Sequence, residues 1–398
     1  MNYVIVGNGV AGTTAASAIR KTDSNGKITV ISDEPYPFYS RIRLVEFLAN
    51  DLDANTLTVK KESWYIENNI SLILNTSVSR IDPDKKDVVL SSGETIKYDK
   101  LLLATGGLSF VPPIPGSGKK GVFTLRTLKD AIAIRDFANA SNHRIIFVGG
   151  GILGLESGNS LIKTGNMVSV VEHSQRLLPR QMDMDGAEIL KKQMEKMGFS
   201  FYLGVKTKEI TGNEYAKAII FENGETLDCD MIIISAGVRP NISLAEQLGL
   251  KIEKGLIVNN RMETEIPGIY AAGDLIQHNG IYYGIWPSAE KQGEIAGINM
   301  SGIEAQYQGT TRTNRLKIMG IDLLSIGDID PEGIKESIVM KDMQNFIYKK
   351  LVIEDNKIIG AILYGDQKDM NKILNAISNS TDISNIRTKL ELWDFEKL

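Results

Sequence analysis

The most informative stretch of this chain is Tyr3-Val4-Ile5-Val6-Gly7-Asn8-Gly9-Val10-Ala11-Gly12. Four apolar residues suited to a buried strand lead into a Gly-x-Gly-x-x-Gly turn, and the small residues that follow can open a helix. In that arrangement backbone N–H groups and the positive end of the helix dipole face a pyrophosphate, and glycines let it approach closely. The stretch therefore predicts a dinucleotide-binding βαβ unit.

The same pattern occurs a second time in the chain. The apolar run Ile145 to Val148 leads into Gly149-Gly150-Gly151-Ile152-Leu153-Gly154. One such motif is weak evidence, but two in matching local context predict a chain that binds two dinucleotides. The chain has one cysteine, so no dithiol can relay electrons between them. We therefore expect the electrons to leave for a separate partner.

An acidic residue follows the second predicted strand of the first unit. This strand, Lys27 to Ile31, is followed by Asp33 and Glu34. A dinucleotide-binding fold places a carboxylate for the ribose hydroxyls about 20 residues after its glycine loop. Both residues are candidates for that role, and a pair of solvated turn carboxylates is the alternative.

The second unit has its own carboxylate at the corresponding place. The predicted strand Met167 to Val171 ends in Glu172, 18 positions after Gly154. A carboxylate there suits the adenosine ribose of NAD and repels the 2′-phosphate of NADP. Arg176 and Arg180 follow, and either could favour NADP, but we expect NADH.

The bulk composition is that of a globular protein with more than one domain. The chain has 398 residues, of which 42% are hydrophobic and 24% charged, and its net charge is -4. This balance argues against general nucleic-acid or anionic-membrane binding, although a local basic dock remains possible. No apolar run approaches the roughly 18 residues of a membrane span. A strand from Tyr3 leaves no room for a signal sequence, so we expect a cytoplasmic protein.

Cysteine and histidine usage offers no metal or disulfide chemistry. Cys229 precedes the predicted strand Met231 to Ile234, where we expect it to be structural. One cysteine cannot build a disulfide scaffold, an iron–sulfur cluster or a thiolate metal site. His143, His173 and His278 are far apart in the sequence, and we expect no metal.

Two buried strands end in small residues, which suggests two related domains in series. The first runs from Lys100 into Ala104-Thr105-Gly106, and the second from Met231 into Ala236-Gly237-Val238. Between them, Val111 to Gly116 is rich in proline and predicts a linker. The chain then returns to the first domain. From about Gln308 short strands alternate with turns, which predicts a small α+β appendage.

Two further blocks lie between the second strand end and the appendage. Ile269 and Tyr270 lead into Ala271-Ala272-Gly273-Asp274. Trp286-Pro287 then opens a run of small and charged residues to Asn299, which predicts a helix with proline in its first turn.

Taken together, the chain resembles the flavoprotein family with two dinucleotide-binding domains and the pyridine nucleotide–disulfide oxidoreductase fold. The resemblance rests on both glycine loops (the second with Leu155-Glu156), Ala104-Thr105-Gly106 and Tyr270-Ala271-Ala272-Gly273-Asp274, in this order. It implies an α/β fold with FAD on the first loop and NAD(H) on the second. The implied domains are an interrupted FAD domain (1–110 and 239–307), an NAD(H) domain (111–238) and a C-terminal α+β domain (308–398). Asp274 would hydrogen-bond the ribityl and pyrophosphate region of FAD.

Within that family, Pro35 to Leu44 looks most like the NADH:rubredoxin reductases and the flavin module of nitrite reductases. Other branches have redox-active cysteines in this region, and their absence here excludes those sulfur-based activities. The block Leu316 to Asp322, with Ser325 to Asp328, resembles the same group. We expect the chain to depart from the nitrite reductases here, without their cysteine-rich cluster domain and sirohaem domain.

The resemblance implies an enzyme that moves electrons from NADH through flavin to rubredoxin or a similar small acidic carrier. Alternatives are an NADH oxidase that reduces dioxygen to peroxide, the NADH-dehydrogenase component of a nitrite reductase system, and a redox-sensing binding module. The expected oligomeric state is a monomer or a homodimer.

Four residues are candidates for the reaction itself. Arg41 is the first choice for a cation at the reactive flavin edge, and Arg43 the second. Glu156 resembles the glutamate that faces a basic residue near the nicotinamide in this family, and a buried Arg–Glu pair would orient both groups. Solvated arginines are the alternative. Trp286 either lines the nicotinamide side or packs in the core.

The remaining expectations concern cofactor binding and the acceptor dock. For an acidic carrier, we expect Arg41, Arg43, Arg312, Arg315 and Lys317 to cluster near an exposed flavin edge. The residues expected to bind the cofactors are Gly7, Gly9, Val10, Ala11, Gly12, Asp33, Glu34, Arg41, Ala104, Thr105, Gly106, Gly149, Gly151, Ile152, Leu153, Gly154, Glu156, Glu172, Gly237, Gly273, Asp274 and Trp286.

Overall fold

The computed structural model of the protein describes residues 1–139, 142–310, 313–318, 320–396 and 398, with only the backbone for 313–318. Its contacts group the chain into two compact units. The first unit consists of Met1–Arg43, Leu52–Leu108 and Val238–Thr311, and the second of Leu44–Asp51, Ser109–Gly237 and Arg312–Leu398. The three-domain boundaries expected from the sequence stay a prediction.

The first unit is built on a five-stranded parallel sheet. Its strands, in spatial order, are β19 (Ile269–Ala271), β7 (Lys100–Leu103), β1 (Asn2–Val6), β2 (Lys27–Ile31) and β3 (Ile70–Ile73). The central strand β1 is apolar and almost wholly buried, as strands covered on both faces of a parallel sheet are. A separate antiparallel sheet consists of β4 (Val78–Asp82), β5 (Asp87–Leu90) and β6 (Thr95–Lys97).

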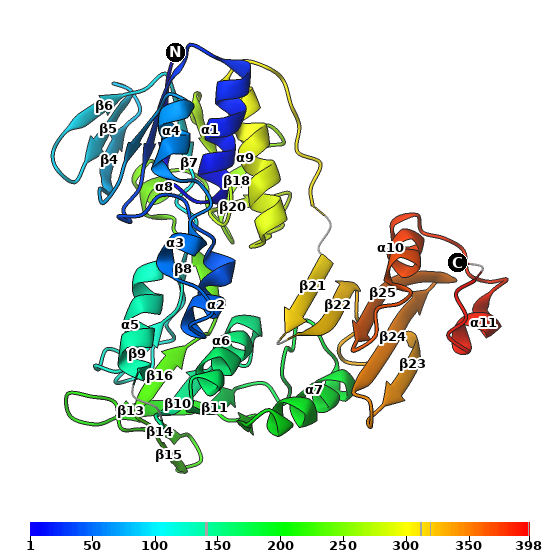
Figure 1. Ribbon diagram of the computed structural model, residues 1–398. Helices are drawn as coiled ribbons and strands as arrows, with labels where there is room; N and C mark the ends of the chain where they lie inside the picture. Colours follow the sequence, from blue (N-terminus) through cyan, green and yellow to red (C-terminus); the bar gives the residue numbers. More distant parts are fainter. Residues whose placement is uncertain (140–141, 311–312, 319, 397) are drawn as a thin grey trace. The chain divides into compact units, whose positions relative to one another are not determined.

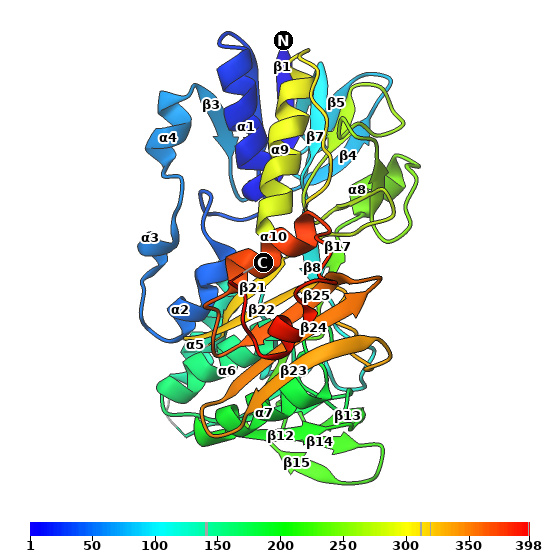
Figure 2. The same cartoon turned by 90° about the vertical axis from the view of Figure 1, so that its right-hand side faces the viewer.

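Two long helices of the first unit lie side by side (Figures 1 and 2). They are α1 (Val10–Thr22), which follows the first glycine loop, and α9 (Trp286–Met300). Their backbones approach so closely that a Cβ atom on Gly293 would lie 2.3 Å from the carbonyl oxygen of Ala11. The predicted helix at Pro287 to Asn299 is therefore present, and its small residues serve this contact.

The second unit contains a parallel sheet of the same plan. Its strands are β12 (Phe199–Leu203), β11 (Met167–Glu172), β10 (Arg144–Val148), β16 (Met231–Ile234) and β9 (Val122–Thr124), and its helices are α5 (Leu128–Ala138), α6 (Ile152–Lys163) and α7 (Met184–Lys196). In both sheets the strand before the glycine loop is central, as in Rossmann-type folds. An antiparallel sheet of β13 (Thr207–Thr211), β14 (Ala218–Phe221) and β15 (Thr226–Asp228) accompanies it, so the predicted duplication extends to these additions.

The second unit also contains an antiparallel C-terminal sheet with α10 (Met370–Ser378) packed on β25 and β22. Its strands are β21 (Thr313–Ile318), β22 (Ile321–Gly327), β25 (Lys357–Tyr364), β24 (Ile347–Glu354) and β23 (Glu336–Asp342). This confirms the predicted α+β appendage. Strands β21 and β23 and a last short helix, α11 (Arg387–Glu391), were not predicted from the sequence.

Short elements complete the fold. They are η1 (Arg41–Arg43), α2 (Leu44–Leu48), α3 (Ala54–Leu57), α4 (Glu62–Glu67), β8 (Gly107–Ser109), β17 (Val238–Pro240), α8 (Ser243–Gln247), β18 (Leu256–Val258) and β20 (Ile276–His278). Val111 to Gly116 forms no helix or strand, as predicted. None of the helices in the described part of the chain is long and apolar enough to cross a membrane. The described residues include no cluster of three or more His, Cys, Asp or Glu side chains suited to a metal ion.

Two candidate dinucleotide sites

The first glycine loop is pressed against the end of β7 on one side and is open on the other. Gly7 has φ +117°, and a Cβ atom there would lie 2.1 Å from the carbonyl oxygen of Ala104. Gly9 caps the N-terminus of α1, and no described atom would lie within 4 Å of a Cβ atom at this position. The open side faces the free N–H groups of the helix start, which is where this fold binds a pyrophosphate.

A buried side chain in the same loop has a hydrogen-bond donor to spare. Asn8 Oδ1 accepts a 2.8 Å hydrogen bond from the Tyr65 hydroxyl. Asn8 Nδ2 is buried and has no acceptor among the described residues. Because an unpaired buried donor costs about 1–3 kcal/mol, this amide suits an acceptor of a bound dinucleotide. Asn8 occupies a variable position of the glycine motif, so the sequence offered no signal for it.

Three of the predicted blocks meet at the C-terminal edge of the first sheet. Ala104 lies against Gly7, and the Thr105 hydroxyl donates a 2.9 Å hydrogen bond to the carbonyl oxygen of Asn241. The Gly273 N–H donates to Gln292 Oε1 at 3.0 Å, and a Cβ atom on Gly273 would lie 3.1 Å from the Ala11 Cβ. The backbone of Asp274, the next residue, therefore lies near the first turn of α1, where a ligand of the glycine loop would lie.

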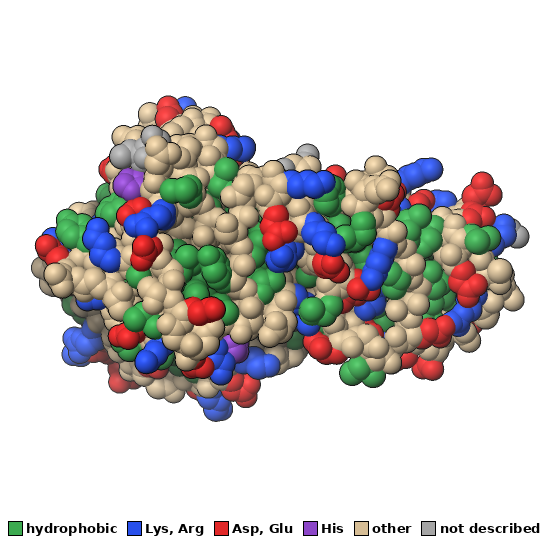
Figure 3. All heavy atoms as spheres, turned by 90° about the horizontal axis from the view of Figure 1, so that it is seen from below, with side chains coloured by type: hydrophobic (Ala, Val, Ile, Leu, Met, Phe, Trp, Pro, Cys, Tyr) green, Lys and Arg blue, Asp and Glu red, His purple; other side chains and the backbone are tan. Residues whose placement is uncertain are grey.

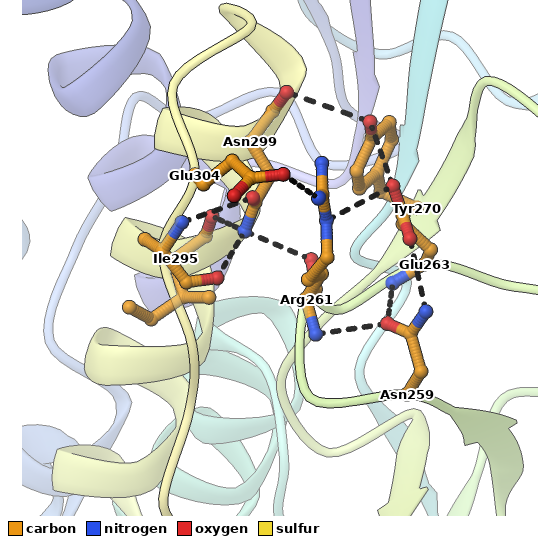
Figure 4. A network of polar contacts seen from close by, with 8 residues as sticks. Asn259, Arg261, Glu263, Tyr270, Ile295, Asn299 and Glu304 are labelled. Atoms are coloured by element: carbon orange, nitrogen blue, oxygen red, sulfur yellow. Dashed lines mark hydrogen bonds and ion pairs between the residues drawn. The ribbon is translucent and has the colours of Figure 1, made fainter.

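The strand that precedes Asp274 is held by a polar network at the far end of α9 (Figure 4). The Tyr270 hydroxyl lies 3.5 Å from both Glu263 Oε1 and the Asn299 carbonyl oxygen. Arg261 Nη1 donates to Glu304 Oε1 at 2.7 Å, and Asn299 Nδ2 donates to the Arg261 carbonyl oxygen at 3.2 Å. The network ties α9 to β19 and so fixes the position from which Asp274 extends.

The carboxylate after β2 is bound by the segment that follows it. Glu34 accepts hydrogen bonds of 2.5 Å from the Tyr39 hydroxyl and from Arg41 Nη2. Asp33 is exposed, and Arg43 Nη1 lies 3.4 Å from the Thr56 carbonyl oxygen. The carboxylate partner of Arg41 is thus Glu34, one of the two expected ribose ligands. The cofactor roles of these four residues stay predictions.

Trp286 is the first residue of α9 and is half-buried. Its ring centroid lies 5.8 Å from that of Phe38. Behind it, the Ser288 hydroxyl pairs with the Tyr307 hydroxyl at 2.9 Å and accepts a 2.8 Å hydrogen bond from Gln292 Nε2. The start of α9 is therefore firmly braced, and Trp286 has an aromatic neighbour of its own. Whether it lines a nicotinamide stays a prediction.

The second glycine loop repeats the geometry of the first. Gly149 has φ +120°, and a Cβ atom there would lie 2.4 Å from the Ser235 carbonyl oxygen. Gly151 caps α6, and a Cβ atom there would meet no described atom within 4 Å; the same is true at Gly237. The predicted pair of loops thus has one shape in both units, with an open face above the helix start.

Glu172 lies directly beneath this second loop. Its Oε2 accepts a 2.6 Å hydrogen bond from the Gly150 N–H, and its Oε1 accepts a 2.7 Å bond from the Ser174 N–H. The side chain therefore joins the loop to the segment after β11. This is the place predicted for a ribose-binding carboxylate, and that role stays a prediction.

Glu156 lies in the second turn of α6, and burial raises its pKa to about 7. A carboxyl group with a raised pKa binds more protons folded than unfolded, so its contribution destabilises the fold as pH rises from 4.5 to about 7. At pH 8 we expect the free energy of unfolding of Glu156→Gln to exceed that of the wild type by on the order of 3 kcal/mol, and its unfolding temperature to be higher. At pH 4.5 the two proteins should unfold at the same temperature.

Thermal unfolding at both pH values measures this difference. Glu246→Gln, at an exposed glutamate of α8, is the control and should match the wild type throughout. An equal shift of the Glu156→Gln variant at both pH values would show that titration of this carboxyl is not the cause.

Comparison with known proteins identifies the family. The model for the pyridine nucleotide-disulphide oxidoreductases matches residues 1–293, and the model for the rubredoxin NAD+ reductase C-terminal domain matches residues 313–381. The chain belongs to the pyridine nucleotide-disulphide oxidoreductase family. Membership in this oxidoreductase family confirms the expected α/β fold with its C-terminal domain, and FAD and NADH as the cofactor pair.

Individual members of the family are similar over almost the whole chain. The NADH-rubredoxin oxidoreductase of Clostridium acetobutylicum is 34% identical, with 96% of each chain covered. A crystal structure of NADH:rubredoxin oxidoreductase from that organism superimposes with a TM-score of 0.85, 31% identity and 99% of both chains covered. The nitrite reductase [NAD(P)H] of Bacillus subtilis (strain 168) is 37% identical over 96% of this chain. The chain spans about half the length of that protein, 48%.

Proposed function

We propose that this chain transfers electrons from NADH through FAD to rubredoxin or a similarly small, acidic one-electron carrier. The observation that carries the proposal is the C-terminal match at residues 313–381 to the domain of rubredoxin NAD+ reductases. The similarity to the Clostridium NADH-rubredoxin oxidoreductase over 96% of both chains supports it.

The state of the single cysteine supports direct transfer without a sulfur relay. Cys229 is fully buried, and burial, with Asp230 and Asp228 adding to it, raises the pKa of its thiol to about 12. A reactive thiol needs access and a lowered pKa, and Cys229 has neither. An electron acceptor must therefore take its electrons from the flavin itself.

Each cofactor has its own set of protein contacts in this proposal. The Gly7–Gly12 loop, Asn8 Nδ2 and Asp274 bind FAD, while the second loop and Glu172 bind NADH. FAD, when bound, supplies the chemistry that turns a two-electron donor into two one-electron transfers. The start of α9, with Pro287 in its first turn, directs partial positive charge toward a ligand at that helix end, worth about 0.3–2 kcal/mol for an anion.

The test is anaerobic stopped-flow reoxidation of the NADH-reduced protein by a panel of purified carriers. The proposal expects rubredoxin to reoxidise the protein much faster than dioxygen does, and cytochrome c reduction to depend on added rubredoxin. A protein that binds no FAD, or that rubredoxin cannot reoxidise, would end the proposal.

Salt should slow only the second half of this reaction. An acidic carrier needs a local basic surface, so we expect its reoxidation rate to fall about tenfold between low and physiological ionic strength. Reduction of the flavin by NADH in the same samples is the internal control and should change little. A salt-indifferent reoxidation rate would contradict an electrostatic dock.

The cations expected to build this dock are only partly described. Arg312 lies outside the described residues, as do the side chains of Arg315 and Lys317. On the face drawn in Figure 3, basic and acidic side chains are intermixed. The cluster therefore stays a prediction, which the salt experiment tests without reference to individual residues.

A second candidate function is electron supply within a nitrite-reducing system. The 37% identity to the Bacillus nitrite reductase over 96% of this chain favours it. In that case rubredoxin would reoxidise the protein no faster than an unrelated carrier does. NADH consumption would instead require a nitrite-reducing partner protein and nitrite.

A further inference from the structure

Arg176, the first arginine after Glu172 in the sequence, pairs with a carboxylate. Arg176 Nη2 donates a 2.7 Å hydrogen bond to Glu332 Oε1. The Arg176 side chain is only 12% exposed, and its Nε is buried without an acceptor among the described residues. The guanidinium is therefore a largely buried cation with one carboxylate partner and a donor to spare.

The position of Arg176 is set by the second glycine loop. Its neighbours Leu177 and Leu178 are fully buried. The Leu178 N–H donates a 3.2 Å hydrogen bond to the Gly150 carbonyl oxygen, and Leu177 Cδ2 would lie 3.0 Å from a Cβ atom on Gly150. Because Gly150 also donates to Glu172, Arg176 belongs to the wall of the same dinucleotide site.

Glu332 reaches this wall from the C-terminal sheet. It lies in a turn organised by Asp330, whose carboxylate accepts 2.9 Å hydrogen bonds from the N–H groups of Ile334 and Lys335. The Asp330 carbonyl oxygen accepts a 2.8 Å hydrogen bond from Lys350 Nζ, which also lies 3.1 Å from Asp183 Oδ2. This buried bridge connects the turn of Glu332 to the segment that follows Arg176.

We propose that Glu332 is a specificity-determining residue of the NADH site, which occupies Arg176 and so withholds it from the 2′-phosphate of NADPH. An arginine next to the end of this strand is what accommodates a 2′-phosphate in dinucleotide-binding folds. With Glu332 in place, a phosphate would have to displace a carboxylate and approach two negative charges, Glu172 and Glu332. The inference rests on the proposed NADH binding and gives the C-terminal domain a part in coenzyme choice.

The test compares both coenzymes in the reductive half-reaction, without any acceptor. We expect Glu332→Gln to raise kcat/KM for NADPH about tenfold, because a charge-assisted partner of Arg176 is lost. The value for NADH should change less than twofold. Glu354→Gln is the matched control, because Glu354 of β24 pairs at the surface with Lys335, which lies in the same turn as Glu332, and should leave the ratio unchanged.

A second substitution separates a direct effect from a general loosening of the domain. In the Glu332→Gln background, Arg176→Ala should return NADPH use to the wild-type level, because the gain requires the guanidinium. A gain that persists without Arg176, or no gain in Glu332→Gln, would overturn the inference. Glu172→Ala should lower NADH use more than NADPH use; equal losses would show that Glu172 does not select the coenzyme.

Binding measurements give a readout that does not depend on turnover. Calorimetry with adenosine 2′,5′-bisphosphate and with AMP reports the 2′-phosphate contribution directly. Glu332→Gln should tighten the bisphosphate about tenfold and leave AMP unchanged. If the wild type binds neither nucleotide and NADH does not reduce it, the proposed NADH binding itself fails. Normal NADH reduction with an unchanged bisphosphate affinity refutes only the role of Glu332.

Discussion

Gly9→Ala should yield a folded protein that no longer retains FAD. A Cβ atom at Gly9 meets no described atom within 4 Å, so the substitution leaves the loop and α1 undisturbed. The added methyl group points into the open side of the loop, where the pyrophosphate must approach the helix start. We expect FAD affinity to fall on the order of a hundredfold, or about 2.7 kcal/mol. Flavin absorbance per protein and titration of the apoprotein with FAD measure this loss.

The second loop provides the matched comparison. Gly151 is equally open, so Gly151→Ala should keep FAD and its yellow colour while NADH binding weakens on a similar scale. Gly118→Ala, at a glycine with open surroundings outside both loops, should change neither cofactor.

Substitution of Gly12 distinguishes a clash within the protein from a clash with the ligand. A Cβ atom there would lie 1.9 Å from the Gly7 carbonyl oxygen, so Gly12→Ala should damage the first unit itself. Full FAD content in Gly9→Ala, or loss of both cofactors in Gly151→Ala, would contradict the assignment of one dinucleotide to each loop.

Lys350→Met should destabilise the C-terminal sheet by about 3–5 kcal/mol, because it leaves a buried carboxylate without its cation. The Lys350 side chain is 3% exposed and pairs with Asp183, which is itself 12% exposed. Asp183 also accepts a 2.5 Å hydrogen bond from the Tyr348 hydroxyl and caps α7 through the Gly186 N–H. Asp183, which loses its cation in this variant, therefore contacts both β24 and α7.

Hydrogen exchange at the amides of β24 measures the loss where it occurs. Lys341→Met is the control, because Lys341 joins the same sheet to Asp185 of α7 through an exposed pair, and such pairs contribute up to about 1 kcal/mol. Asp183→Asn in the Lys350→Met background should recover part of the stability, because it removes the unpaired charge and keeps a capping oxygen. Equal effects of Lys350→Met and Lys341→Met would show that burial does not set the strength of this bridge.

The sequence predicted those parts of the fold whose signals are local. Both glycine loops, the strands before them and the helices after them follow from apolar runs and glycine spacing within about ten residues. Glu172 was found in the same way, because the length of a βα unit places the carboxylate at a set distance from the loop. Strands β21 and β23 were not predicted because charged and polar residues interrupt their apolar pattern, and α11 was not predicted because its five residues span little more than one helical turn.

Contacts between distant segments had no such signal. Tyr65 supports Asn8 from 57 residues away, and Glu332 meets Arg176 across 156. From the sequence, Arg176 could favour NADP. The structure shows that its guanidinium pairs with the carboxylate of Glu332. Likewise, the sequence offered Glu34 as a candidate ribose ligand, and only the structure shows that it pairs with Arg41; its ribose role stays a prediction.

Residue order alone thus established two dinucleotide loops, their parent fold and a chemistry without sulfur, because each depends on the geometry of a few consecutive residues or on a count. Folding in three dimensions settled which charges meet: Glu332 with Arg176, Lys350 with Asp183, Glu34 with Arg41. These pairs form between separate elements, and their partners become neighbours only when the sheets and helices pack. If Glu332 selects the coenzyme, as we propose, that selection belongs to the second class, because it depends on whether Glu332 or a 2′-phosphate pairs with Arg176.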